Sequence, residues 1–200
     1  MQQHDKVLEA MGCDDLSTLI DPEFLAEYGL GPAGQYGMVC QDVLANIALL
    51  ESLGARPFVH DVRQAPNWSE HGIAKDVTTD FALGYSNHQQ IELLGPGVNT
   101  TMYSDKIPDD GTIALHHVCV FQNDIAGMEK RLNQAGYPTV VSGHIGIGGL
   151  YTTRYKYFET RAELGFYLEL CEYRLFGLQA TPGEKIISGI GSMQKRFAKS

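Results

Sequence analysis

Apolar residues recur with helical spacing in two stretches of the chain that lie 82 positions apart. Each stretch follows an aspartate, Asp42 or Asp124, which suits the N-cap of a helix. Each ends at a glycine, Gly54 or Gly136, which suits a helix C-terminus. The pattern predicts two equivalent amphipathic helices. Their apolar faces consist of Val43, Ile47 and Leu50 in the first helix and Ile125, Met128 and Leu132 in the second.

Strand-like segments surround both helices. One precedes each helix, and the segments that follow end in a similar pattern, in which a glutamate alternates with aliphatic residues. The chain therefore predicts two copies of a strand–helix–strand–strand–strand unit, related by a pseudo-twofold axis. We expect an α+β fold made of two βαβββ modules, at about residues 35–95 and 115–173.

Helices are also predicted at both ends of the chain. Asp21 and Pro22 suit the start of a helix, and Gly29 its end. Residues 183–198 predict a last amphipathic helix, with Ile186, Ile190, Met193 and Phe197 on one stripe. We expect a helical extension over residues 1–33, one domain over 34–177 and a C-terminal helical segment over 178–200.

Charge and composition narrow the range of partners. The chain has 200 residues and a net charge of −9, which argues against a nucleic-acid partner because phosphates require a basic face. None of the four cysteines forms a CxxC pair, and we interpret them as reduced. Neither a signal peptide nor a membrane-spanning apolar run is recognisable. We therefore expect a cytoplasmic protein without a membrane partner.

Two glutamates stand out among the polar residues. Glu92 and Glu169 are flanked by aliphatic residues on the last strand of each module, and an unpaired buried carboxylate is costly. A metal ion would supply the partner. The repeat also places Gln35 opposite His117, each seven residues before its aspartate, and this spacing favours His117 over the adjacent His116. Structural roles remain open for both: an amide bonded to backbone, and a core histidine.

Two carboxylates, one imidazole and one amide oxygen form a mixed oxygen and nitrogen donor set. Such a set suits one divalent ion of zinc, nickel, cobalt, manganese or iron(II), and it lacks the thiolates of a structural zinc site. Four protein ligands around an octahedral ion leave two positions for water or for two vicinal substrate oxygens.

Three short phrases of the chain resemble the vicinal oxygen chelate superfamily, which includes glyoxalase I, methylmalonyl-CoA epimerase, extradiol dioxygenases and bleomycin-resistance proteins. They lie at residues 91–96, 115–118 and 168–170, within a resemblance that covers about residues 35–173. The resemblance is nearest to the glyoxalase I and epimerase type. It implies a curled mixed sheet around one metal cleft, with Gln35, Glu92, His117 and Glu169 as metal ligands.

The resemblance also implies a reaction. We expect a divalent-metal-dependent isomerase, epimerase or lyase that abstracts a proton next to a metal-chelated carbonyl, with Glu169 as general base and Glu92 assisting on the opposite face. The alternatives are an iron(II) extradiol-type dioxygenase and a non-catalytic protein that binds a small ligand. After Glu92 the chain lacks the phrase of glutathione-using glyoxalases, and before Glu169 it lacks the Pro-Lys phrase expected of a methylmalonyl-CoA epimerase. The substrate is therefore predicted only as a small molecule with vicinal oxygens, and the assembly as a homodimer.

Several other residues receive structural interpretations. Residues 143–149 are rich in glycine but precede a strand, so we expect a flexible loop near the cleft rather than a dinucleotide site. Tyrosines at alternate positions of residues 151–157 are expected to line the cleft or the core. A solvated position is expected for Arg154, Lys156, Arg161, Glu163 and Glu172.

Overall fold

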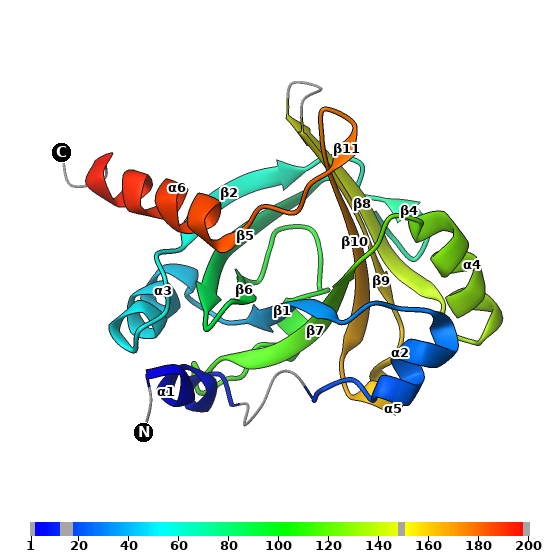
Figure 1. Cartoon of the computed structure of the whole chain (residues 1–200), viewed down its shortest axis with the longest axis horizontal. Helices are drawn as coiled ribbons and strands as arrows, with labels where there is room; N and C mark the ends of the chain where they lie inside the picture. Colours follow the sequence, from blue (N-terminus) through cyan, green and yellow to red (C-terminus); the bar gives the residue numbers. More distant parts are fainter. Residues whose placement is uncertain (1–2, 13–17, 148–150, 198–200) are drawn as a thin grey trace.

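The computed structural model describes residues 3–12, 18–147 and 151–197 and confirms the predicted α+β fold (Figure 1). Both βαβββ modules are present. The first consists of β1 (Ala33–Val39), α3 (Val43–Ser52), β2 (Val59–Ala65), β5 (Val77–Ser86) and β6 (Gln89–Leu94). The second consists of β7 (Ala114–Phe121), α4 (Ile125–Gln134), β8 (Thr139–Ile147), β9 (Tyr151–Phe158) and β10 (Tyr167–Leu175).

The eight strands of the two modules and the two strands of a short hairpin form one curled mixed sheet. Its order is β2-β5-β6-β1-β7-β10-β9-β8-β3-β4. β1 and β7 pair antiparallel at the centre, and each has a parallel partner on its other side, β6 or β10. The pseudo-twofold axis predicted from the repeat therefore passes between β1 and β7.

The short hairpin explains how strongly the sheet curls. It consists of β3 (Ser69–Glu70) and β4 (Ile73–Ala74), belongs to the first module, and pairs with β8 of the second. Only three residues separate β2, at one end of the strand order, from β3, near the other end. Such a connection spans at most about 14 Å, so the two ends of the sheet must lie close together.

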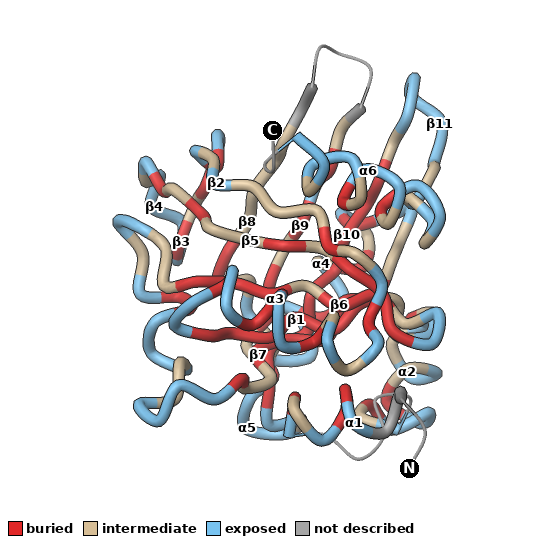
Figure 2. Tube along the Cα trace, turned by 90° about the vertical axis from the view of Figure 1, so that its left-hand side faces the viewer, coloured by how far each residue is buried: buried red, intermediate tan, exposed pale blue. Residues whose placement is uncertain are grey.

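The two module helices cover the outer face of the sheet, α3 over β5 and β6, and α4 over β9 and β10. Both predicted N-caps are confirmed, because Asp42 accepts from the Ala45 amide at 2.9 Å and Asp124 from the Gly127 amide at 2.8 Å. The apolar helix faces predicted from the sequence lie in the core between helices and sheet. The central strands are buried over most of their length (Figure 2).

The elements before β1 and around the second module are short. The N-terminal extension contains α1 (Gln3–Ala10) and α2 (Pro22–Tyr28). The Asp21 side chain caps α2, and Gly29 ends it in a left-handed conformation (φ 67°), as predicted. The remaining elements are the 3-10 helix η1 (Ser104–Lys106), α5 (Arg161–Leu164) and β11 (Leu178–Gln179), which pairs with β10.

The C-terminal helix α6 (Glu184–Phe197) packs on β2 and β5. Its predicted apolar stripe, however, is 40 to 74% exposed at Ile186, Ile190, Met193 and Phe197. Ile187 and Gly191 are buried instead, because the Gly191 backbone lies against the backbone of Phe58 just before β2. The side-chain amide of Gln194 bonds both backbone groups of His60, each at 3.0 Å, and so fixes the helix to the edge strand.

Two further expectations are corrected. β8 continues to Ile147, so most of the predicted glycine-rich loop is strand, and residues 148–149 lie outside the described residues. Glu172 is buried rather than solvated, because Arg174, two residues along the same face of β10, bonds its carboxylate at 2.6 Å. Among the described helices, none is long and apolar enough to cross a membrane.

Candidate metal centre

Strand register brings the predicted site residues onto one face of the sheet. Glu92 of β6 pairs with Gly37 of β1, and Gly37 pairs with His117 of β7. A Cβ added at Gly37 would lie 1.8 Å from Cε1 of His117, so the imidazole ring occupies the space where a side chain would stand. A glycine inside a strand often marks such a close approach. Here it makes room for the His117 ring over β1.

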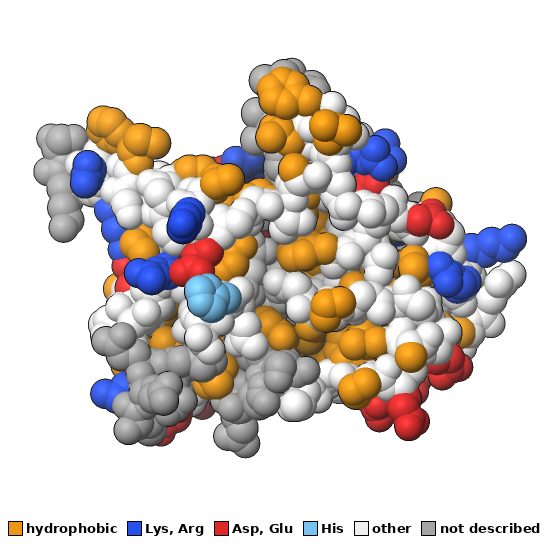
Figure 3. Space-filling model, in the orientation of Figure 1, with side chains coloured by type: hydrophobic (Ala, Val, Ile, Leu, Met, Phe, Trp, Pro, Cys, Tyr) orange, Lys and Arg blue, Asp and Glu red, His pale blue; other side chains and the backbone are white. Residues whose placement is uncertain are grey.

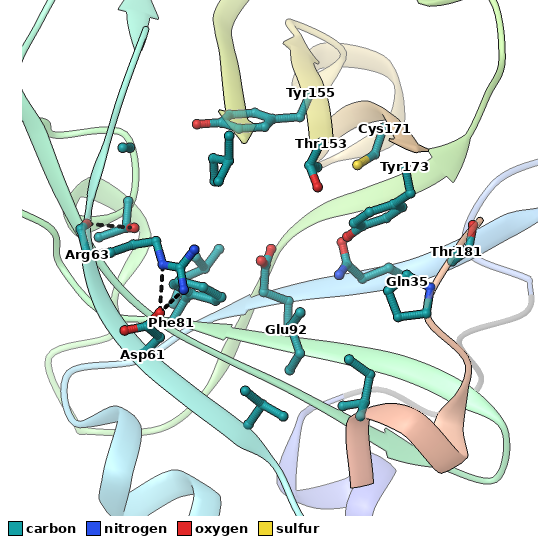
Figure 4. Close-up of a pocket in the computed structure, with 18 of the residues that line it drawn as sticks. Gln35, Asp61, Arg63, Phe81, Glu92, Thr153, Tyr155, Cys171, Tyr173 and Thr181 are labelled. Carbon is teal, nitrogen blue, oxygen red and sulfur yellow. Dashed lines mark hydrogen bonds and ion pairs between the residues drawn. The ribbon is translucent and has the colours of Figure 1, made fainter. Parts of the chain in front are cut away.

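Glu92, His117 and Glu169 converge at this point. Nε2 of His117 lies 3.3 Å from Oε2 of Glu92 and 3.3 Å from Oε2 of Glu169. One ligand atom of each residue lies within 4.8 Å of the others, a spacing that suits a shared metal ion. The exposed fractions of the three side chains are 0% for His117, 6% for Glu169 and 17% for Glu92. Only Glu92 therefore has appreciable contact with solvent, and its carboxylate projects into the cleft in Figure 4.

The neighbouring His116 sets the orientation and the protonation of His117. Nε2 of His116 lies 3.0 Å from the Met102 carbonyl oxygen, which can only accept, so this nitrogen carries a proton and donates it. Burial, followed by the nearby His117, lowers the pKa of His116 well below its usual value, so the ring is neutral and its Nδ1 accepts. Nδ1 of His117, 3.0 Å away, must then be the donor. Nε2 of His117 is left to face the two carboxylates.

Nε2 of His117 and the Oε2 atoms of Glu92 and Glu169 all carry lone pairs, so they repel one another at this distance unless a cation lies between them. Nε2 of His117 and Oε2 of Glu169 are buried and make no hydrogen bond within the described part of the chain. Burial alone would lower the pKa of His117, but Glu169 and Glu92 raise it to about 9, so a proton is held there when no metal is bound. Burial raises the pKa of Glu92, and His117 partly offsets this effect. The donor set therefore fits a divalent ion in place of that proton.

Gln35 lies on the same face, in the next row of the sheet. It is buried and lines the cleft together with Glu92 and Glu169. Its Nε2 donates to Oε1 of Gln90 at 3.0 Å, and Gln90 in turn donates to the Tyr85 hydroxyl at 3.0 Å. These bonds hold the amide by its nitrogen and leave the carbonyl oxygen of Gln35 for the cleft. Its role as fourth ligand remains a prediction.

A cleft of about 610 Å³ opens above the three converging side chains. Its walls are mainly apolar and come from both modules and from α6. Hydrophobic side chains gather between α6 and the β10–β11 end on the face shown in Figure 3. The predicted tyrosine face is found here, since Thr153, Tyr155 and Tyr157 line the cleft.

The basic residues of the second module lie elsewhere. Arg154 and Lys156 line a separate depression near the start of α4, and Lys156 bonds Glu129 at 2.6 Å. Arg161 pairs with Glu159. Their predicted surface positions agree with this arrangement, although Lys156 and Arg161 are paired rather than simply solvated.

Sequence reasoning missed two contributors to the site. It set His116 aside as a neighbour of the ligand, although His116 orients His117. It also gave no role to Gly37, although a glycine within a strand signals close packing. The aromatic residues Trp68, Phe81 and Tyr103 that line the cleft carry no recognisable pattern in the sequence.

Comparisons with known proteins agree with the fold and the resemblance. Residues 34–155 match the family model described as the Glyoxalase/Bleomycin resistance protein/Dioxygenase superfamily. Among curated proteins, none matches the chain.

Among solved structures, a Streptomyces coelicolor methylmalonyl-CoA epimerase variant in complex with 2-nitronate-propionyl-CoA is similar, with a TM-score of 0.52 and 15% identity over 71% of this chain and 96% of that chain. The Mycobacterium tuberculosis methylmalonyl-CoA epimerase gives a TM-score of 0.50 and 16% identity over 71% and 87%. A methylmalonyl-CoA epimerase in complex with methylmalonyl-CoA and NH4+ gives a TM-score of 0.51 and 15% identity over 71% of this chain and 94% of that chain. At such identities these likenesses establish the fold alone.

Proposed function

We propose that this chain, which belongs to the glyoxalase/bleomycin resistance protein/dioxygenase superfamily, is a divalent-metal-dependent isomerase, epimerase or lyase. Its reaction would remove a proton from the carbon next to a carbonyl group. The observation that carries the proposal is the convergence of Glu92, His117 and Glu169 at the base of an apolar cleft. Two of their atoms are buried there without a hydrogen-bond partner among the described residues.

Glu92, His117 and Glu169 would hold the ion, with Gln35 as a fourth ligand through its carbonyl oxygen. Two carboxylates, an imidazole and an amide suit zinc, nickel, cobalt, manganese or iron(II). When bound, such an ion stabilises negative charge that develops on a substrate oxygen. Two vicinal oxygens of the substrate would then bind beside Glu92, His117 and Glu169.

Glu169 is the proposed general base. Its carboxylate reaches the cleft from β10. A carboxylate that binds the metal has a lowered proton affinity, so Glu169 would act as base once substrate binding displaces or loosens it from the ion. Glu92 reaches the same space from β6, on the other side of His117. In an epimerisation, one carboxylate would accept the proton on one face of the substrate while the other returns it on the opposite face.

The donor set of one histidine and two glutamates does not match that of an iron(II) extradiol dioxygenase. Extradiol dioxygenases hold iron with two histidines and one glutamate. Here one histidine faces the cluster, because the Nε2 of His116 is turned away toward the Met102 carbonyl. The set with two glutamates fits proton transfer better, since two carboxylates can act on opposite faces of one carbon.

The test is proton exchange at the α-carbon. Metal-loaded protein in deuterated water would be offered a panel of hemithioacetals, acyl-CoA epimers, catechols and the uncharged α-hydroxy ketone benzoin, with mass spectrometry as the readout. We expect α-deuteration of at least one carbonyl substrate, loss of that activity after chelation, and recovery with added metal. Glu169→Gln should keep much of the metal while exchange falls at least about a hundredfold.

Glu163→Gln is the matched control, because Glu163 is an exposed glutamate remote from the cluster and should leave exchange unchanged. Near-normal exchange by metal-bound Glu169→Gln would eliminate Glu169 as the base. Retained ligand binding in a protein that takes up no metal would instead favour the non-catalytic binding protein. Oxygen uptake with catechols would favour the dioxygenase.

A further inference from the structure

We propose that the cleft accepts an uncharged, ring-containing α-hydroxy ketone rather than a substrate with an anionic tail such as a coenzyme A thioester or a glutathione adduct. This inference rests on the proposed function, because it takes the vicinal oxygens to lie at Glu92, His117 and Glu169. It adds the nature of the rest of the substrate. The argument uses the charge of the lining, the composition of the walls and the position of α6.

The described lining offers no free positive charge for an anionic tail. It contains three carboxylates, from Asp61, Glu92 and Glu169, and one cation, Arg63. Nε of Arg63 donates to Oδ2 of Asp61 at 2.6 Å, so the cation is already neutralised within the cleft wall. With a divalent ion held by Glu92 and Glu169, the remaining charge is this neutral pair. Phosphates or a peptide carboxylate would enter without compensation.

The walls instead match a substrate with rings. Trp68 and Phe81 of the first module and Tyr155 and Tyr173 of the second present aromatic side chains to the same space. The ring centroids of Trp68 and Tyr155 are 6.2 Å apart at 58°, so the two modules meet through aromatic contact at this wall. Aromatic rings stack favourably at such surfaces. The volume of about 610 Å³ lies in the range typical of pockets for drug-sized ligands.

Helix α6 and the segment before it add an apolar wall. Ile186, Ile187 and Ile190 line the cleft from the helix. The Tyr85 hydroxyl donates to the Pro182 carbonyl oxygen at 2.9 Å, and Lys195 pairs with Glu51 at the far end of the helix. With the Gln194 bonds to β2, these contacts fix α6 in place. A ligand therefore meets an aliphatic surface on this side of the cleft, where a charged tail would lose hydration.

Trp68 is the chain's single tryptophan and lines the cleft, so its fluorescence reports occupancy. Metal-loaded protein would be titrated with benzoin, an uncharged two-ring α-hydroxy ketone, and separately with propionyl-CoA and S-hexylglutathione. We expect benzoin to bind at least tenfold more tightly than either charged compound. Equal or tighter binding of propionyl-CoA or S-hexylglutathione would overturn the inference.

Two variants on α6 provide a matched pair. Ile190 lines the cleft and is 40% exposed, whereas Met193 lies outside the lining and is 53% exposed, so both tolerate a charge without loss of folding. Ile190→Glu should weaken benzoin binding at least fivefold, and Met193→Glu should leave it unchanged. Equal effects of the two variants would show that benzoin binds elsewhere.

The same titrations separate this inference from the proposed function. Tight benzoin binding without α-deuteration of any compound would support the apolar cleft and contradict the proposed function. Binding and α-deuteration of an acyl-CoA, with benzoin inert, would support the proposed function and contradict the inference about the substrate.

Discussion

Replacing Gly37 with alanine should displace His117 and so prevent metal binding, although Gly37 is not itself a ligand. The new Cβ would lie 1.8 Å from Cε1 of His117, which is 1.6 Å short of the 3.4 Å at which ordinary contact begins. The ring cannot retreat freely, because its Nδ1 is bonded to His116 and the Tyr157 ring packs against it edge to face (ring centroids 4.9 Å apart). A zinc–nitrogen bond of about 2.0–2.1 Å tolerates an error of only about 0.2 Å. We expect affinity for zinc to fall at least about a hundredfold.

The assay is competition for zinc with a chromophoric chelator, together with thermal unfolding. Gly34→Ala is the control, because its Cβ would meet the Phe121 ring at 2.4 Å, on the same two strands but away from Glu92, His117 and Glu169. Both variants should lose about 1–3 kcal/mol of stability through overpacking. Only Gly37→Ala should lose zinc. Normal zinc affinity in folded Gly37→Ala would refute the assignment of His117 as a ligand.

Three further predictions concern the histidines. In the metal-free protein the pKa of His117 is about 9, so below that pH a metal ion must displace a proton from this ring. Zinc affinity, measured by calorimetry, should therefore rise about tenfold per pH unit from 7 toward 9 and then level off. An affinity that does not change with pH would contradict this prediction. The raised pKa also means that the metal-free protein loses this contribution to stability as pH rises from about 6.5 through 9, which thermal unfolding would detect. His116→Phe keeps a ring at this position but removes the acceptor for Nδ1 of His117. In the chelator competition this variant should bind zinc about 10- to 100-fold more weakly. An unchanged affinity would show that His116 does not orient His117.

The sequence was most informative where the same residue types occur at the same spacing in both modules. Asp42 and Asp124 cap their helices through the same contact. The same spacing favoured His117 over His116, and in the structure Nε2 of His117 lies 3.3 Å from both glutamates while Nε2 of His116 faces the Met102 carbonyl. Glu92 and Glu169 were identifiable because a carboxylate between aliphatic neighbours on a strand needs a partner. These signals depend on residues close together in the chain.

Features that depend on pairing between distant strands were not predictable. The space over Gly37 exists only because β1 pairs with β7 in one register, and the β3–β4 hairpin joins β8 across the curl of the sheet. Helical periodicity found α6 and its apolar stripe, of which Ile186 and Ile190 line the cleft, but it did not indicate which side meets β2, because the close approach at Gly191 decides this. Glu172 was misplaced although its partner is local, since Arg174 lies two residues along the same face of β10.

The central claim is that Glu92, His117 and Glu169 hold one divalent ion. The most direct measurement is an anomalous difference map from crystals of the protein loaded with zinc, collected at the zinc absorption edge. The account predicts one strong peak about 2.0–2.2 Å from Nε2 of His117 and from a carboxylate oxygen of each glutamate. A zinc peak elsewhere, or an empty cluster in crystals that contain one equivalent of zinc, would contradict it.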